Sequence, residues 1–294
     1  MKYPALISFL LLLASCTPPD PMSGFDEVLD ALVGSYPEAV VAVAVRDPEN
    51  GVSWDRNPDR SFHAASTMKV PVMIEVYRQA ELGRLSLDHQ LPVVNSFRSI
   101  VDESNFKIED DSDDAMYRRL GEFMSVRDLV FQMITVSSNL ATNLLIDTVT
   151  PDSVQGTMQR LGTRHMQVLR GVEDIKAFQR GMSNTTTAAD LALVMQRLME
   201  GAAVSPASDE AMREVLLAQQ FGEMIPAGVP FDAEIAHKTG QITAIHHDAA
   251  IVYPPLQNPF VLVILIEGLT DSQQSAALGA SIAKAVYERV RPGV

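Results

Sequence analysis

Apolar positions along this chain follow a strand-like pattern near both ends and a helical pattern between them. Helical spacing over 25–35 is followed by a β-branched run over 39–45, and a turn at 47–51 predicts a hairpin. Near the other end, a continuous apolar run over 260–267 predicts a buried strand, and helical spacing returns over 275–290. Two further strands are predicted at 233–239 and 249–253.

Helical patterns dominate the middle of the chain, where the loops are rich in Asp, Ser and Thr. One helix is predicted to begin at Ser66 and to run up to Gly83. Two helical patterns share 126–147, and they meet at Ser137. The chain therefore changes from strands to helices and back to strands.

This order of elements predicts an α+β fold with two lobes. Strands from both ends would form one antiparallel sheet, covered by the terminal helices as an α/β sandwich, and the middle would form an inserted all-α lobe. We expect the sheet lobe at about 25–65 and 225–294, and the helical lobe at about 66–224. A chain of 294 residues, 47% of them hydrophobic, is long enough to bury the core of such a domain.

The first residues have the composition of a targeting segment. Lys2 is the only charged residue before Asp20, and the apolar run between them is too short to span a bilayer. It ends in Leu-Ala-Ser before Cys16, which resembles the bacterial lipoprotein signal, whose cysteine becomes lipidated. We predict a signal peptide over 1–15, a lipid on Cys16 and a tether over 16–24. An ordinary secretory signal is the alternative.

These features predict a membrane-anchored lipoprotein of the bacterial cell envelope, facing the periplasm or the exterior. Cys16 is the only cysteine, so the chain can form no internal disulfide. The net charge of −14 argues against a nucleic-acid partner. The acidic run over 109–114 lacks the glycine of a calcium-binding loop, and we expect a solvated loop there.

Three short motifs in a fixed order carry the candidate chemistry. Ser66-Thr67-Met68-Lys69 opens a predicted helix, Ser137-Ser138-Asn139 lies between two helices, and Lys238-Thr239-Gly240 ends a predicted strand. The Ser-x-x-Lys pattern also occurs at 104–107, which runs into the acidic stretch over 109–114, and at 281–284, which lies inside the last predicted helix, after both other motifs. The ordered set supplies two hydroxyls, two amines and an amide, which is the equipment for acyl transfer.

A serine hydroxyl is a poor nucleophile and needs a base. Ser66 is the candidate nucleophile, and Lys69 lies one helical turn away on the same face, where it can take the proton. A lysine acts as a base only if its pKa is depressed, either by burial or by a second cation such as Lys238. Ser137 can then pass a proton to the departing nitrogen.

The other motif residues are candidates for binding the substrate. The backbone N–H groups of Ser66 and Gln241 can stabilise a developing oxyanion. The Asn139 side chain can hold a substrate amide. A substrate carboxylate can bind at the third motif, through Lys238 and Thr239, which are followed by Gly240.

Other patterns give weaker signals. His246, His247 and Asp248, together with His63, carry side chains that can bind metals. Neighbours on a strand point to opposite faces, however, so a structural or surface role is predicted. The chain has neither a Gly-x-Ser-x-Gly elbow nor a phosphate-binding glycine loop. We therefore expect no metal and no cofactor.

The three motifs, in their order and context, resemble those of class A β-lactamases and penicillin-binding proteins. The resemblance extends from about 25 to 290. It implies the β-lactamase and transpeptidase-like fold and a serine hydrolase that opens the β-lactam amide through an acyl-serine intermediate. It also implies a monomer that acts on a small-molecule β-lactam or a peptidoglycan stem peptide. A D-alanyl-D-alanine carboxypeptidase or transpeptidase, or a non-hydrolysing penicillin-binding sensor, are the alternatives.

The chain departs from the family pattern in three ways. Ser138 stands where the family usually has aspartate, at a mostly structural position. Glu173 is the candidate for the deacylating glutamate, but its spacing from Arg170 is one residue longer than usual, and Ala177 replaces the expected asparagine. A solvated or salt-bridging carboxylate is the alternative for Glu173. The arginine that often holds the substrate carboxylate is absent from the neighbourhoods where the family has it.

Overall fold

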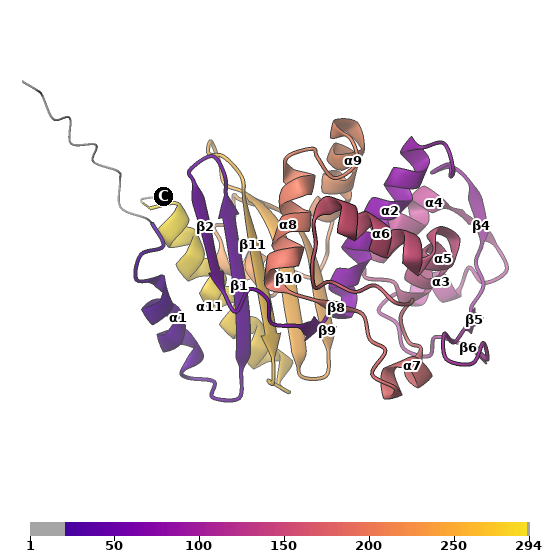
Figure 1. Ribbon diagram of the computed structural model, residues 1–294, viewed down its shortest axis with the longest axis horizontal. Coiled ribbons are helices and arrows are strands. Elements are labelled where there is room, and N and C mark those ends of the chain that lie inside the picture. Colours follow the sequence, from indigo (N-terminus) through magenta and orange to yellow (C-terminus); the bar gives the residue numbers. More distant parts are fainter. Residues whose placement is uncertain (1–20, 293–294) are drawn as a thin grey trace, which may run out of the picture.

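The computed structural model describes residues 21–292, which form a sheet-containing part and a helical part (Figure 1). The predicted signal peptide, Cys16 and the first residues of the predicted tether lie outside the described residues. Within the described part, no helix is both long enough and apolar enough to cross a membrane. The lipid anchor therefore stays a prediction.

A five-stranded antiparallel sheet joins the two ends of the chain. Its order is β2-β1-β11-β10-β9, so the first strand of the chain pairs with the last strand of the sheet. In this central pair, Val40 lies opposite Glu267 and Arg46 lies opposite Val261. The predicted antiparallel sheet built from both ends is confirmed. The strands are β1 (Val40–Asp47), β2 (Val52–Arg56), β9 (Glu234–Ile242), β10 (Ile245–Tyr253) and β11 (Phe260–Glu267).

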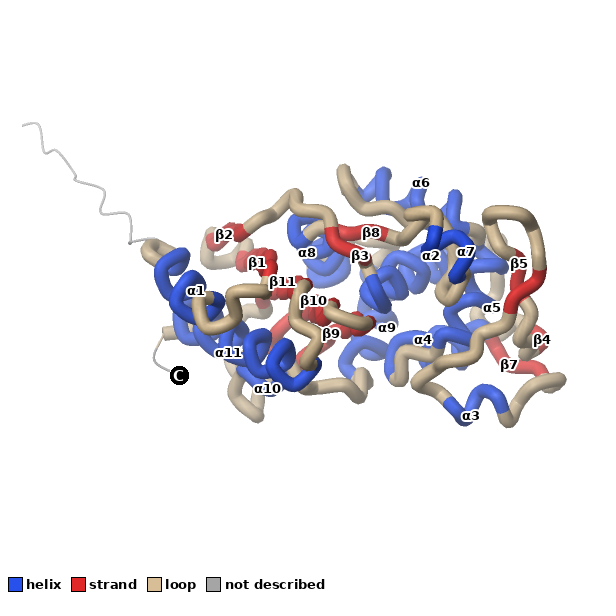
Figure 2. The backbone as a smooth tube through the Cα atoms, turned by 90° about the horizontal axis from the view of Figure 1, so that it is seen from below, coloured by secondary structure: helices blue, strands red, loops and turns tan. Residues whose placement is uncertain are grey.

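Helices cover both faces of the sheet because β11 is apolar on both sides. On one face, Ile264 packs with α1 (Phe25–Val33) and α11 (Ser272–Val290). On the other face, Val263 packs with α8 (Ala188–Met199). Figure 2 shows α1 and α11 on one side of the sheet and α8 on the other. A helix from the middle of the chain therefore lies on the sheet. This corrects the predicted lobe boundaries, which placed the whole of 66–224 in the helical lobe.

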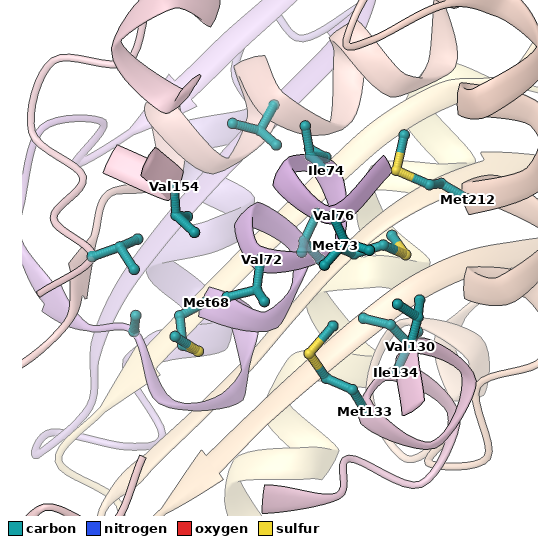
Figure 3. Packing of buried hydrophobic residues seen from close by; sticks show 14 of the residues in the cluster. Met68, Val72, Met73, Ile74, Val76, Val130, Met133, Ile134, Val154 and Met212 are labelled. Carbon is teal, nitrogen blue, oxygen red and sulfur yellow. The ribbon is translucent and has the colours of Figure 1, made fainter. Parts of the chain in front are cut away.

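The helical part is built around α2 (Lys69–Glu81), which follows a short 3₁₀ turn, η1 (Ala65–Met68). The residues of α2 from Lys69 to Tyr77 are all buried. A helix packed on every side cannot rotate or slide without opening the core, so its first turn is a rigid support for reactive side chains. Figure 3 shows Val72, Met73, Ile74 and Val76 of α2 close to Val130, Met133, Ile134, Val154 and Met212 of neighbouring helices.

The remaining elements are helices around α2, helices that flank the sheet or the loops, and pairs of short strands. Sequence reasoning missed the short strands, because two or three residues are too few to show an alternating pattern. The helices are α3 (Asp114–Tyr117), α4 (Val126–Thr135), α5 (Asn139–Val149), α6 (Pro151–Leu161), α7 (Ile175–Gln179), α9 (Pro206–Leu217) and α10 (Ile225–Gly228). The strand pairs are β3 (Phe62–His63) with β8 (Thr185–Thr186), β4 (Gln90–Pro92) with β7 (Phe123–Ser125), and β5 (Phe97–Arg98) with β6 (Asn105–Phe106).

A buried ion pair ties the C-terminal end of α11 to the β1–β2 hairpin. The Arg291 guanidinium donates to Asp47 Oδ2 at 2.5 Å and to the Asn258 carbonyl at 2.6 Å. The same guanidinium lies over the Phe260 ring, 5.1 Å from its centroid. Asp47 is 0% exposed and Arg291 is 4% exposed, so neither charge has water to replace its partner.

We expect Asp47→Ala to lower the free energy of unfolding by about 3–5 kcal/mol, because it leaves a buried guanidinium without its counter-charge. Urea denaturation of the variant and the wild type measures this difference. The matched control is Glu288→Ala, which removes an exposed pair with Lys284 on the same helix and should change the free energy by less than about 1 kcal/mol. An equal effect of both substitutions would show that the buried pair does not stabilise this corner.

Candidate active site

Ser66 lies in η1, at the rim of a pocket with a volume of about 780 Å³. The turn that presents it is tight, since Ala65 has a φ of 46° and its N–H donates to His63 Nδ1 at 3.0 Å. The Thr67 hydroxyl donates to the Ala64 carbonyl at 2.6 Å and closes the turn. Among the described residues, the Ser66 hydroxyl has no hydrogen-bond partner. Its side chain is therefore free to meet a ligand.

Two lysine side chains meet at one hydroxyl below this pocket. Lys69 Nζ donates to Ser137 Oγ at 3.1 Å, to the Ser137 carbonyl at 2.6 Å and to Asn139 Oδ1 at 2.9 Å. Lys238 Nζ reaches the same Ser137 Oγ at 3.0 Å and the Thr239 carbonyl at 2.8 Å. The structure thus brings together the three motifs that the sequence separates.

Burial changes the protonation of both lysines, each of which is 0% exposed. Burial lowers the pKa of Lys69 to about 7, while Asp111 and Glu173 act to raise it. Burial, followed by the neighbouring Lys69, lowers the pKa of Lys238 well below its ordinary value. Burial, one of the two causes that the sequence suggested for Lys69, is the largest cause. A neutral amine next to Ser66 is therefore accessible near neutral pH.

Ser137 lies at the junction of α4 and α5 in a left-handed conformation, with a φ of 59°. The next residue, Ser138, caps α5 by accepting the N–H of Ala141 at 3.3 Å. Serine and aspartate are both good N-caps, so the departure at Ser138 keeps the structural role of this position. The Lys69 ammonium fixes the strained Ser137 backbone by binding its carbonyl.

Asp111 completes the start of α5 from a distant part of the chain. Its two carboxylate oxygens accept the backbone N–H groups of Asn139 and Leu140, each at 2.8 Å. In the same acidic run, Asp113 caps α3. The prediction of a solvated loop over 109–114 is therefore wrong for these two carboxylates. Nothing in the sequence near α5 identifies its acidic partner, because that partner lies on another loop.

The edge strand β9 passes very close to the Ser66 turn. A Cβ on Gly240 would lie 3.0 Å from the backbone nitrogens of both Ser66 and Thr67, so any side chain here would push the Ser66 turn away from β9. The outer edge of β9 pairs with no strand in the described sheet. Thr239 and Gln241, on either side of Gly240, line the pocket. The predicted binding residues of the third motif therefore surround Ser66.

Glu173 lines the same pocket from the loop between α6 and α7. Its φ of 62° is unusual for a residue with a side chain. Burial and the nearby Asp110 raise the pKa of Glu173, while Arg170 and Lys69 act to lower it. Arg170 does not bind Glu173, since its guanidinium donates to the carbonyls of Met182 and Gly171. Glu173 is therefore only partly exposed, and within the described part of the chain it forms no salt bridge.

Asn143 fixes the residue before Glu173, and sequence reasoning missed it. Asn143 Oδ1 accepts the Val172 N–H at 2.7 Å, and Asn143 Nδ2 donates to the Val172 carbonyl at 2.9 Å. A Cβ on Gly171 would collide with Asn143 Oδ1, so this close contact requires glycine. An asparagine inside an apolar helical pattern was the available signal, but it does not name its partner.

The histidines beside β9 have structural partners. His247 Nε2 donates to the His63 carbonyl at 3.0 Å, and His247 Nδ1 accepts the Ile266 N–H at 3.2 Å. Asp248 Oδ1 lies 2.9 Å from His237 Nδ1. Within residues 21–292, no group of three or more His, Cys, Asp or Glu side chains is arranged to hold a metal ion.

Comparisons with known proteins identify the family of this chain. The β-lactamase enzyme family matches residues 24–290. β-Lactamase L2 of Stenotrophomonas maltophilia is 26% identical over 82% of this chain and 78% of that protein. β-Lactamase CARB-3 of Pseudomonas aeruginosa is 23% identical over 73% of this chain and 75% of that protein.

Solved structures give the same result over a larger share of the chain. The β-lactamase of Sphaerobacter thermophilus superposes with a TM-score of 0.77 and 28% identity, covering 91% of this chain and 97% of that one. PBP-A superposes with a TM-score of 0.80 and 24% identity, covering 93% and 98%. An ancestral class A β-lactamase gives a TM-score of 0.78 and 25% identity, covering 89% and 98%. The chain belongs to the β-lactamase enzyme family, among the class A β-lactamases and penicillin-binding serine hydrolases.

Proposed function

We propose that this protein hydrolyses the amide bond of β-lactams through an acyl-enzyme on Ser66. The observation that carries the proposal is the hydrogen-bonded row Lys69–Ser137–Lys238 beneath a pocket that also exposes Ser66 and Glu173. This arrangement supplies a nucleophile, its base, a proton donor and a candidate base for water in one cleft.

Acylation follows from the geometry of the row. Ser66 Oγ attacks the lactam carbonyl, and its proton passes to the neutral amine of Lys69. The backbone N–H groups of Ser66 and Gln241 stabilise the oxyanion of the tetrahedral intermediate. Both lysines donate to Ser137 Oγ, so the Ser137 proton is free to move to the lactam nitrogen as its bond to carbon breaks.

Substrate binding uses the polar groups that line the cleft around Ser66. The Asn139 side chain holds the substrate amide. The ammonium of Lys238 and the hydroxyl of Thr239 bind its carboxylate. Gly240 keeps β9 close enough for the backbone of Gln241 to reach the carbonyl.

Deacylation requires a water that a base orients against the ester on Ser66. Glu173 is that base, because it lines the pocket beside Ser66 and lies within electrostatic range of Lys69. If Glu173 does not activate water, the same acylating groups would give a penicillin-binding protein that stays acylated, or a D-alanyl-D-alanine peptidase.

The location of the protein is a second proposal, which rests on the sequence alone. We propose that a lipid on Cys16 anchors the enzyme at the cell envelope, facing the periplasm or the exterior, where β-lactams arrive. In that position the enzyme would contribute to antibiotic resistance.

Ser66→Ala should abolish the covalent adduct with penicillin while the fold remains intact, because Ser66 is the proposed nucleophile. Mass spectrometry of the protein mixed with penicillin, followed over time, measures the adduct in both forms. The same time course in the wild type distinguishes a hydrolase, which frees its serine, from a sensor, which does not. An adduct of unchanged yield on another residue of the variant would overturn the assignment.

The acylation rate should depend on pH through Lys69, whose pKa burial lowers to about 7. Because the base must be neutral, the rate should fall about tenfold per unit below that pKa and level off above it. Stopped-flow acylation between about pH 5 and pH 9 measures this profile. Lys69→Ala should be slow and lose the dependence. A profile in the wild type that is flat over this range would exclude Lys69 as the base.

Glu173→Gln should still acylate at Ser66 but accumulate the acyl-enzyme. The expected loss in turnover is about 10²–10⁴-fold, the usual contribution of a general base. Steady-state hydrolysis and the amount of trapped adduct give the two quantities independently. Turnover equal to that of the wild type would mean that another group activates the water.

Cys16→Ser should release the protein from membranes in bacteria that process lipoproteins, because it removes the residue that would carry the lipid. Fractionation of cells that express each form measures the bound share. Activity in the soluble fraction of the variant is the control for folding. A wild-type protein that is already soluble and keeps a free thiol contradicts the anchor.

A further inference from the structure

Glu173 lies between two residues that are fixed from outside its loop. Asn143 of α5 binds both the N–H and the carbonyl of Val172 on one side. On the other side, Asp174 is 3% exposed, and its carboxylate accepts three hydrogen bonds. No motif in the sequence assigns a role to Asp174.

The Asp174 carboxylate connects the Glu173 loop to a separate hairpin, formed by β5, β6 and the turn between them. Oδ1 accepts the Ser99 hydroxyl at 2.9 Å, and Oδ2 accepts the Ile100 N–H at 2.9 Å. Oδ1 also accepts the Ala177 N–H at 3.1 Å and so caps α7. The buried Asp174 carboxylate therefore joins the β5–β6 hairpin and the start of α7 to the loop position directly after Glu173.

Glu173 depends on its neighbours because its own side chain is not held. Among the described residues, the Glu173 carboxylate has no hydrogen-bond partner, and its backbone adopts a φ of 62°. This conformation is strained for a residue with a side chain, and it persists only where surrounding contacts impose it. The neighbours of Glu173 in the chain, Val172 and Asp174, make the hydrogen bonds that hold the backbone on either side of it.

We propose that Asp174 is a positioning residue for Glu173, and that the β5–β6 hairpin controls deacylation through it. The inference rests on the proposed function, in which Glu173 orients the deacylating water. Groups that acylate lie on η1, α2, the α4–α5 junction and β9, and among the described residues Asp174 is hydrogen-bonded to none of them, although it lines the same pocket. Loss of Asp174 should therefore slow deacylation and leave acylation nearly unchanged.

The test measures acylation and deacylation rate constants separately, by mass spectrometry of the protein mixed with penicillin and then freed from excess. Asp174→Ala should slow deacylation by about 10–10²-fold, the effect of a displacement near 1 Å, and change acylation by less than about threefold. Ser99→Ala removes the bond from the hairpin side and leaves the loop sequence intact. It should act in the same direction by about threefold or more, and it keeps the test valid if Asp174→Ala folds poorly.

Lys176→Ala is the matched control. Lys176 joins the same helix to the same hairpin, through Asp102 at 2.8 Å and Ser104 at 2.6 Å, but it does so at the exposed surface. It should leave both rate constants within about twofold. If Lys176→Ala slows deacylation as much as Asp174→Ala does, the effect belongs to the general stability of the hairpin and the proposal is overturned.

A double-mutant cycle separates this inference from the proposed function. In the Glu173→Gln background, Asp174→Ala should have no further effect on deacylation, because the group that it positions is already absent. Additive effects would show that Asp174 does not act through Glu173. If Glu173→Gln itself changes nothing, both the proposed role of Glu173 and this inference fail. If Glu173→Gln slows deacylation and Asp174→Ala does not, only this inference fails.

Discussion

Two buried lysines that converge on one hydroxyl are the constraint on which the rest of the site depends. Removing an ammonium from water costs free energy, and Lys69 and Lys238 are both completely buried. Carbonyl and amide oxygens offset part of that cost, as do the negative charges of Asp111 and Glu173 near Lys69. The part of the cost that is not offset lowers the pKa of both lysines. The amine of Lys69 is therefore available as a base near neutral pH.

The fold supplies the rigidity that this placement needs. Ser66 and Lys69 lie at the start of a helix whose first turns are packed on every side, and Ser137 lies at a junction that Asp111 and Ser138 cap. Lys238 comes from an edge strand, whose free side can approach Ser66 because Gly240 has no Cβ. The groups assigned to acylation therefore all lie on elements of the core or at their ends.

The group assigned to deacylation is supported in another way. Glu173 lies on a loop, in a strained backbone conformation, and depends on Asn143 and Asp174 on either side. This division means that the loop can change without moving the elements that hold Ser66, Lys69 and Ser137. Within one fold, a change at the loop would convert an enzyme that releases its acyl group into a protein that retains it. Strain of this kind is common at functional sites, because the surrounding contacts can impose it there.

The sequence by itself determined the α+β order of elements and the identity of the motif residues, because hydrophobic period and motif order are local properties of the chain. It also made Glu173 a candidate for the deacylating base, from a resemblance and by its place in the loop. Only the tertiary structure placed α8 on the sheet, brought Asp111 to the start of α5, and fixed Glu173 through Asn143 and Asp174. Each of these is a contact between segments distant in sequence. Period and propensity do not encode such contacts, since they depend on how whole elements pack.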